Sequence, residues 1–290
     1  MAVIEARGLA KTFGRTVALR EVDLTVGEGR IVGLIGPNGA GKTTALNAIL
    51  GLIPFQGHLR VLGRDPWAER DRLMRDVAFI ADVAVLPRWL TVGQTLDYVA
   101  GVHPGFHRAK AESFISRTSI ASHQKVRQLS KGMVAQLHLA LVMAIDARLL
   151  VLDEPTLGLD MIYRKQFFET LLSDYLERSS TIVLATHQVE EIQDVLTDVV
   201  FIDRGRVVLS STMDEIEARW HEVQVRPEQV DAARALGPRH ERQSFGRSVM
   251  LFEGANRAQL VGLGEVRTPG VAELFVTLLG ERTGPAGEVA

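Results

Sequence analysis

Hydrophobic and polar positions alternate through the first 26 residues. In Val22–Val26 every second residue is apolar, which is the pattern of a strand with one buried face. Short apolar runs further along predict more deeply buried strands at Ile31–Ile35, Val77–Ile80, Leu149–Leu152, Thr181–Ala185 and Val199–Ile202. Near-continuous apolar strands are typical of parallel sheets that are covered on both faces.

Helical patterns separate these strands. They predict helices over 44–50, 134–146, 161–178 and 188–196. Strands that alternate with helices predict an α/β fold built on a parallel sheet. The stretch from about 90 to 126 is helical but more polar, and Pro104-Gly105 interrupts it. We therefore expect a helical insertion over about 85–135.

The sequence changes in character after Trp220. Four elements are predicted there: strands over 222–225 and 248–252, and helices over about 228–236 and 271–279. Just before them, Thr212 and Glu215 have the spacing of a capping box and predict the start of a helix. We predict a main domain over 1–219 and a small α+β extension over 220–290.

The amino-acid composition excludes some classes of function. The 290 residues include 33 basic and 35 acidic residues, so charge gives no indication of nucleic acid as a partner. The chain has no cysteine, which excludes disulfides, thiol catalysis and cysteine-ligated metals and suits a reducing compartment. Met1–Arg7 lacks the features of a signal peptide, and no run of about 18 apolar residues is present. A membrane role is therefore expected to need a partner.

One glycine-rich segment has the pattern and the neighbours of a phosphate-binding loop. Its residues are Gly36, Pro37, Asn38, Gly39, Ala40, Gly41, Lys42 and Thr43, with Thr44 continuing into the predicted helix. Backbone N–H groups in such a loop point at one oxyanion, and the helix N-terminus adds partial positive charge. Lys42 is expected to reach the β- and γ-phosphates, and the Thr43 hydroxyl to bind Mg²⁺.

Two carboxylates close the strand Leu149–Leu152. Acidic residues at the carboxyl end of a parallel strand lie beside a phosphate-binding loop in folds of this type. Asp153 is expected to hold Mg²⁺, and Glu154 to act as general base toward the attacking water. The alternative is a solvated strand end, which the spacing from the glycine-rich loop disfavours.

A third signal, Leu129–Met133, precedes the predicted helix over 134–146. Ser130 and Gly132 stand where a hydroxyl and bare backbone N–H groups meet an anion at a helix N-terminus. Taken alone, the same residues describe an ordinary capped helix. Their position about twenty residues before the carboxylates favours the anion-binding interpretation.

Together these motifs resemble the nucleotide-binding subunits of ATP-binding cassette (ABC) transporters, over roughly residues 2–220. Gly36–Thr43 resembles the Walker A motif, Leu149–Glu154 Walker B, Leu129–Met133 the LSGGQ signature, Leu157–Asp160 the D-loop and Thr186-His187 the switch histidine. Phe13 stands where members of this family place the aromatic residue that stacks on adenine. All motifs occur in the order of the family.

The resemblance implies a P-loop NTPase fold with a RecA-like mixed sheet, an N-terminal antiparallel β subdomain and a helical insertion. It implies that two subunits sandwich ATP and Mg²⁺, with Ser130, Lys131 and Gly132 of one subunit capping the nucleotide on the other. Asp160 would lie at the nucleotide, and His187 would contact the γ-phosphate. A separate membrane-spanning permease would place the protein at the inner face of the cell membrane, without direct contact to nucleic acid.

Departures from the family pattern leave alternatives open. Asp82 stands where a glutamine usually touches Mg²⁺ and the attacking water, and it is either a shorter metal ligand or a plain strand-end acid. Lys131 and Met133 replace residues of the signature. The Leu-Ser-Lys-Gly-Met form is most similar to the ABC-2-type export subfamily. A non-transport or regulatory nucleotide-binding module with weak turnover is the alternative function.

Overall fold

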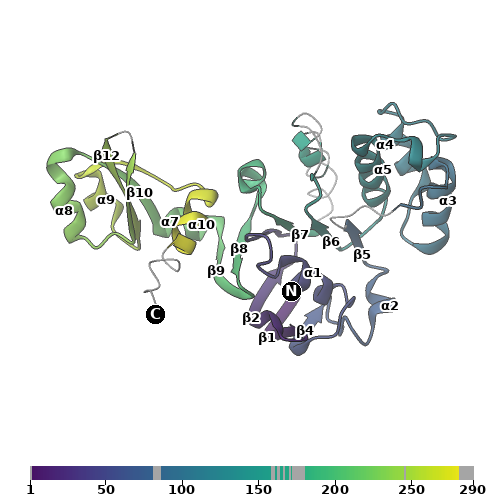
Figure 1. Cartoon of the computed structure of the whole chain (residues 1–290), viewed down its shortest axis with the longest axis horizontal. Coiled ribbons are helices and arrows are strands. Elements are labelled where there is room, and N and C mark those ends of the chain that lie inside the picture. Colours follow the sequence, from purple (N-terminus) through teal and green to yellow (C-terminus); the bar gives the residue numbers. More distant parts are fainter. Residues whose placement is uncertain are drawn as a thin grey trace. The chain divides into compact units, whose positions relative to one another are not determined.

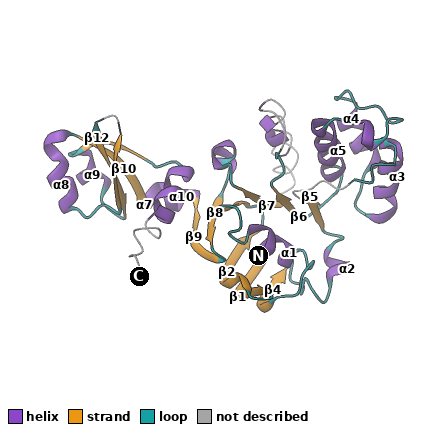
Figure 2. Ribbon diagram, in the orientation of Figure 1, coloured by secondary structure: helices purple, strands orange, loops and turns teal. Residues whose placement is uncertain are grey.

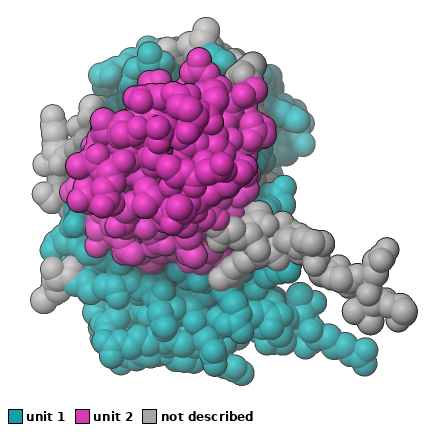
Figure 3. All heavy atoms as spheres, turned by 90° about the vertical axis from the view of Figure 1, so that its left-hand side faces the viewer, with its two compact units in different colours: residues 1–187, 202–207 teal, residues 188–201, 208–290 magenta. Residues whose placement is uncertain are grey.

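The chain folds into two compact units, each described by itself. The computed structural model describes residues 2–80, 86–157, 161, 164–165, 167–169, 171, 180–244 and 246–280. One unit comprises residues 1–187 and 202–207, and the other comprises 188–201 and 208–290 (Figure 3). Neither unit corresponds to the predicted domain over 1–219, so that boundary stays a prediction.

The N-terminal segment forms a three-stranded antiparallel sheet in the order β2-β1-β4. Its strands are β1 (Ala2–Phe13), β2 (Thr16–Gly27) and β4 (Gln56–Val61). In β2, Val22, Leu24 and Val26 are buried while the residues between them are exposed, as the alternation predicts. The predicted strands over 2–26 are therefore confirmed as a long hairpin (Figure 2).

A six-stranded sheet follows the order β5-β6-β7-β3-β8-β9. Its strands are β3 (Ile31–Ile35), β5 (Val77–Ile80), β6 (Leu149–Asp153), β7 (Thr181–Thr186), β8 (Asp198–Asp203) and β9 (Arg206–Thr212). The neighbours β5–β6, β6–β7 and β7–β3 are parallel. Every residue of β3, β6 and β7 is buried, which confirms the parallel sheet predicted from the apolar runs.

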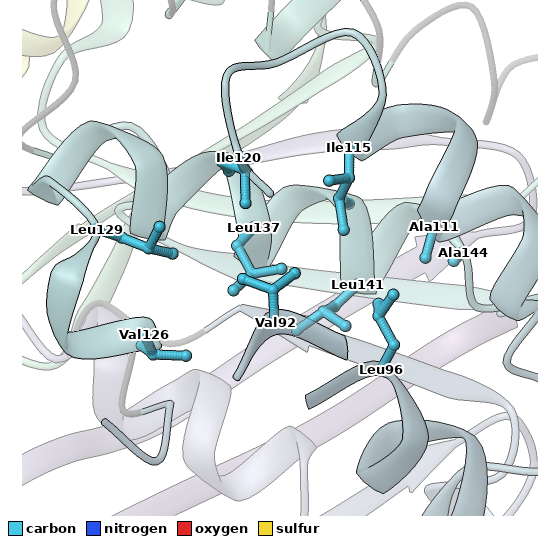
Figure 4. Packing of buried hydrophobic residues seen from close by; sticks show 11 residues of the cluster. Val92, Leu96, Ala111, Ile115, Ile120, Val126, Leu129, Leu137, Leu141 and Ala144 are labelled. Atoms are coloured by element: carbon cyan, nitrogen blue, oxygen red, sulfur yellow. The ribbon is translucent and has the colours of Figure 1, made fainter. Parts of the chain in front are cut away.

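The described part of the first unit also contains helices. They are α1 (Lys42–Ile49), α2 (Arg70–Leu73), α3 (Val92–Val102), α4 (Arg108–Ile115), the 3₁₀ turn η1 (Val126–Gln128) and α5 (Lys131–Met143). The bounds predicted for a helical insertion, about 85–135, stay a prediction. Elements α3, α4 and α5 pack on one another as a helical region (Figure 1). Leu137 and Leu141 of α5 point toward Val92 and Leu96 in its buried core (Figure 4).

Two predicted helices need correction. The helix expected over 134–146 begins earlier, at Lys131, because Ser130 Oγ accepts the N–H of Met133 and caps it. The helix expected over 188–196 is wrong, since the chain forms only the 3₁₀ turns η2 (Val189–Glu191) and η3 (Gln193–Val195). Gln188 makes no side-chain capping bond, so no cap marks the start of an α-helix here. Much of the predicted helix 161–178 lies outside the described residues.

The second unit contains a four-stranded antiparallel sheet in the order β11-β12-β10-β13. Its elements after α7 (Met213–Arg219) are β10 (Trp220–Val225), η4 (Pro227–Gln229), α8 (Val230–Ala235), β11 (His240–Ser244), β12 (Arg247–Glu253), α9 (Arg257–Val261), β13 (Gly264–Arg267) and α10 (Val271–Gly280). Thr212 and Glu215 form the predicted capping box at α7. The edge strands β11 and β13 were not predicted, because edge strands rich in charged residues carry no apolar alternation.

Candidate functional site

The register of the parallel sheet brings three motifs to one edge. Ile35 of β3 is paired with Thr186 of β7, and Asp153 of β6 is paired with Ala185 of the same strand. The residues that follow these strand ends are therefore neighbours: the glycine-rich loop, His187 and Glu154. The carboxyl end of a parallel sheet is where ligands bind in open α/β folds.

At two positions of the glycine-rich loop, only glycine fits the backbone. A Cβ on Gly36 would lie 2.4 Å from the carbonyl oxygen of Ile202, so no side chain fits there. Gly41 has a φ of +111°, and its Cβ would lie 2.7 Å from the carbonyl oxygen of Ala18. Gly41 is the N-cap residue of α1 and no side chain caps this helix. The N–H groups in the first turn of α1 can therefore donate to an anion.

Lys42 lies buried in the centre of the site, with only 6% of its surface exposed. Its Nζ donates to the carbonyl oxygens of Gly36 at 2.7 Å and Pro37 at 3.3 Å. The same atom lies 3.7 Å from Oε1 of Glu154. The ammonium thus joins the loop to the end of β6, where a phosphate could accept its hydrogen bonds.

Glu154 occupies an unusual backbone conformation, with a φ of +45°. Its N–H donates to the carbonyl oxygen of Ala185 at 2.9 Å, which fixes the turn after β6. Its two carboxylate oxygens have separate partners: Thr186 Oγ1 donates to Oε2 at 3.2 Å, and His187 Nδ1 lies 2.8 Å from Oε1. A non-glycine residue held at positive φ carries strain, and such residues are concentrated at functional sites.

The residues present suit a magnesium ion bound with a nucleotide. Asp153, which is 2% exposed, supplies a carboxylate at the end of β6, and Thr43 is an exposed residue in the first turn of α1. Carboxylate and hydroxyl oxygens are the hard ligands that Mg²⁺ prefers. Asp82 and Asp160 lie outside the described residues.

The signature residues occupy another part of the first unit. Ser130 caps α5, Lys131 is exposed and Gly132 is partly exposed. Within the described ranges, no hydrogen bond or ion pair connects these three residues to Lys42 or Glu154. A single chain therefore leaves this helix end available for a ligand outside its own loop.

Phe13 ends β1 and is 49% exposed, as a stacking platform requires. The Nζ of Lys11 lies 4.9 Å from the centre of its ring and donates to the carbonyl oxygen of Pro54 at 2.7 Å. The cation thus covers one face of the ring.

Sequence reasoning missed the contacts that Lys11, Thr186 and Gly205 make in the site. The N–H of Gly205 donates to the carbonyl oxygen of Ala40 in the glycine-rich loop at 2.8 Å. The segment around Gly205 is recognisable as a hairpin turn from its sequence, but nothing local shows that the turn supports the loop.

Known proteins are similar to this chain in sequence. A family model described as ABC transporter matches residues 19–157. The uncharacterized ABC transporter ATP-binding protein YdbJ of Bacillus subtilis is 32% identical over 71% of this chain and 68% of its own length. The chain belongs to the ABC transporter ATP-binding proteins. It is therefore an ABC-type ATPase subunit, as its motifs predict.

Other ABC relatives extend the comparison. The Nod factor export ATP-binding protein I of Sinorhizobium fredii is 36% identical over 71% of this chain and 62% of its own length. The probable multidrug ABC transporter ATP-binding protein YbhF of Escherichia coli is 34% identical over 75% of this chain, which spans 38% of that relative.

Solved structures show the same fold. A dimeric ATP-binding cassette in a post-hydrolysis state, bound to ADP and Pi, has a TM-score of 0.65 at 22% identity, covering 72% of this chain and 98% of that chain. The predicted P-loop fold of the ABC cassette is thus confirmed. Within the described part of the chain, no helix is long and apolar enough to cross a membrane.

Proposed function

We propose that this ABC-type subunit hydrolyses ATP at the edge of its parallel sheet to drive export through a separate membrane-spanning permease. The observation that supports this best is the gathering of Lys42, His187 and Thr186 around the Glu154 carboxylate, with distances of 2.8 to 3.7 Å. Phosphoryl transfer requires chiefly positioning and charge neutralisation, which this group of side chains provides.

In this proposal the triphosphate lies on the backbone N–H groups of residues 36–44. Lys42 neutralises the β- and γ-phosphates, and Phe13 stacks on the adenine. Thr43 and Asp153, with Asp82, would hold Mg²⁺, which supplies positive charge to the transferred phosphoryl group. Glu154 accepts the proton of the attacking water, and His187 orients Glu154 through its 2.8 Å contact.

A second subunit would complete the site. Ser130, Lys131 and Gly132 would cap the nucleotide of the partner, and Asp160 would lie near the same junction. The exposed helix end at Lys131 supports this, as does the dimeric form of the related cassette with ADP and Pi. Closing on ATP and opening after hydrolysis would move two rigid subunits.

Export is the proposed direction because relatives include a Nod factor export protein and a probable multidrug transporter protein. The permease would hold this subunit at the inner face of the cell membrane. The regulatory alternative has no observation in its favour beyond the departures from the family pattern at Asp82 and Met133.

The decisive experiment compares phosphate release from ATP and Mg²⁺ by the purified full chain and its Glu154→Gln variant. Glu154→Gln keeps the shape of the side chain and removes the base, so we expect a rate at least about a hundred-fold lower with unchanged ATP affinity. Glu217→Gln, at an exposed position of α7, is the matched control and should retain the full rate. Equal rates in wild type and Glu154→Gln would contradict the proposal.

The transport partner is tested separately. We expect the chain to co-purify from detergent-solubilised membranes with a membrane-spanning protein. We also expect ATP, but not ADP, to increase the dimer fraction of the Glu154→Gln variant in analytical ultracentrifugation. A monomer at all ATP concentrations would contradict the proposed capping by Ser130.

A further inference from the structure

The hydroxyl of Thr186 contacts the carboxylate of Glu154, the residue proposed as general base. Thr186 is the last residue of β7, is 4% exposed, and donates from Oγ1 to Oε2 of Glu154 at 3.2 Å. His187, the next residue, contacts the other oxygen, Oε1, at 2.8 Å. Two consecutive side chains therefore hold both ends of one carboxylate.

This arrangement depends on where the strand ends. Successive side chains of a strand point to opposite faces, so two neighbours do not normally reach one group. Here β7 ends at Thr186 and His187 lies in a bend. On the other side, the positive φ of Glu154 and its N–H bond to Ala185 turn the carboxylate toward both residues.

We infer that Thr186 is a positioning residue for hydrolysis, which fixes the rotation of the Glu154 carboxylate toward the attacking water. The inference rests on the proposed role of Glu154 as general base. The terminal torsion of a glutamate is broad and roughly two-fold, so the side chain alone does not fix the carboxylate plane. Bonds to both oxygens fix it, and each oxygen retains a second lone pair.

The proton balance leaves Thr186 unchanged. The water oxygen attacks the γ-phosphorus while the bond to the bridging oxygen of ADP breaks, and its electron pair leaves with ADP. The water proton passes to a carboxylate oxygen of Glu154. The proton of Thr186 stays on Oγ1 throughout, so its part is orientation rather than proton transfer.

The test compares Thr186→Val with Thr186→Ser in the full chain. Valine has nearly the same shape without the donor, so we expect kcat to fall about ten- to a hundred-fold, the scale of a lost hydrogen bond to a charged group. The KM for ATP should stay within about two-fold. Thr186→Ser keeps the hydroxyl and should restore most of kcat. Single-turnover release of labelled phosphate resolves the slow rates.

A control variant and a double variant distinguish a positioning role of Thr186 from a general effect on folding. Thr181 is at the other end of β7, fully buried, and its hydroxyl contacts Gly29 N at 3.0 Å and Gly27 O at 3.3 Å. Thr181→Val should lower the melting temperature without lowering kcat. Adding Thr186→Val to Glu154→Gln should not lower the residual rate further, because the base is already absent.

Each outcome is decisive. Wild-type kcat in Thr186→Val, or an equally slow Thr186→Ser, overturns the inference even when Glu154→Gln has lost its activity. If Glu154→Gln keeps the wild-type rate, the proposed function itself fails. A lower kcat in Thr186→Val with a normal KM and rescue by serine supports the positioning role.

Discussion

The N–H of Gly205, in the turn between β8 and β9, donates to the carbonyl oxygen of Ala40 in the phosphate-binding loop at 2.8 Å. The carbonyl oxygen of Gly205 accepts the N–H of Arg20 in β2 at 2.7 Å. One residue thus joins the loop to the antiparallel sheet. The glycine is required sterically, because it has a φ of +76° and a Cβ would lie 2.5 Å from the carbonyl oxygen of Ala18.

We predict that Gly205→Ala lowers the free energy of unfolding by about 2–4 kcal/mol, from positive-φ strain and the clash with the Ala18 backbone. The matched control is Gly63→Ala, because Gly63 has a similar φ of +77° but nothing within 4 Å of its Cβ. That variant should lose only about 1–2 kcal/mol, from the positive φ alone. Urea unfolding measures both losses, and equal losses would show that the clash with the Ala18 backbone does not contribute.

A second prediction concerns the buried ammonium of Lys42. Lys42→Ala removes the cation that bonds to Gly36 and lies 3.7 Å from Glu154. We expect the dissociation constant for ATP to rise roughly ten- to a hundred-fold, the scale of a lost charge-assisted hydrogen bond. Lys165→Ala, which removes an exposed lysine paired with Glu169, should leave the affinity unchanged. Unchanged affinity in Lys42→Ala would refute the assignment of the phosphate-binding loop.

The third prediction separates base stacking from phosphate binding. Phe13→Ala should weaken ATP binding roughly five- to a hundred-fold, since stacking of a base on an aromatic side chain contributes about 1–3 kcal/mol. Lys11→Met removes the cation 4.9 Å from the ring centre and should weaken binding by only about two- to five-fold. Inorganic tripolyphosphate has no base, so its affinity should be the same in all three proteins. Calorimetry gives each constant.

The fourth prediction is a pH dependence of stability. Burial lowers the pKa of His138 in α5 to about 4 from the ordinary value of 6.5. The unfolded chain therefore binds this proton at a higher pH than the folded chain, so stability falls as the pH falls from 6.5 toward 4. The Nδ1 of His138 is buried without a hydrogen-bond partner among the described residues, which agrees with a neutral ring.

His138→Gln should flatten this dependence by up to about 3 kcal/mol across that pH range. His123→Gln, at an exposed position, is the control and should leave the slope unchanged. The measurement is the free energy of urea unfolding at several pH values between 4 and 7. A slope that His138→Gln does not change would mean that this histidine does not titrate as its burial implies.

The strands and the loop motif could be predicted because their signals are local. The apolar run Leu149–Leu152 favours a buried strand, and the glycines of 36–41 favour a curled backbone. The small second unit was predicted less completely, because β11 is polar and α9 has only five residues. Neither has a periodicity that distinguishes it from a loop.

The sequence by itself determined which residue types could bind a triphosphate: the glycines, Lys42, Asp153 and Glu154, in an order that resembles one family. Only the tertiary structure decided which side chains and backbone groups come into contact with them. The contacts of Glu154 with Thr186 and His187, and of Ala40 with Gly205, depend on which strands are neighbours in the sheet and on their register. Strand order arises from packing between segments far apart in the chain, and no local pattern encodes it.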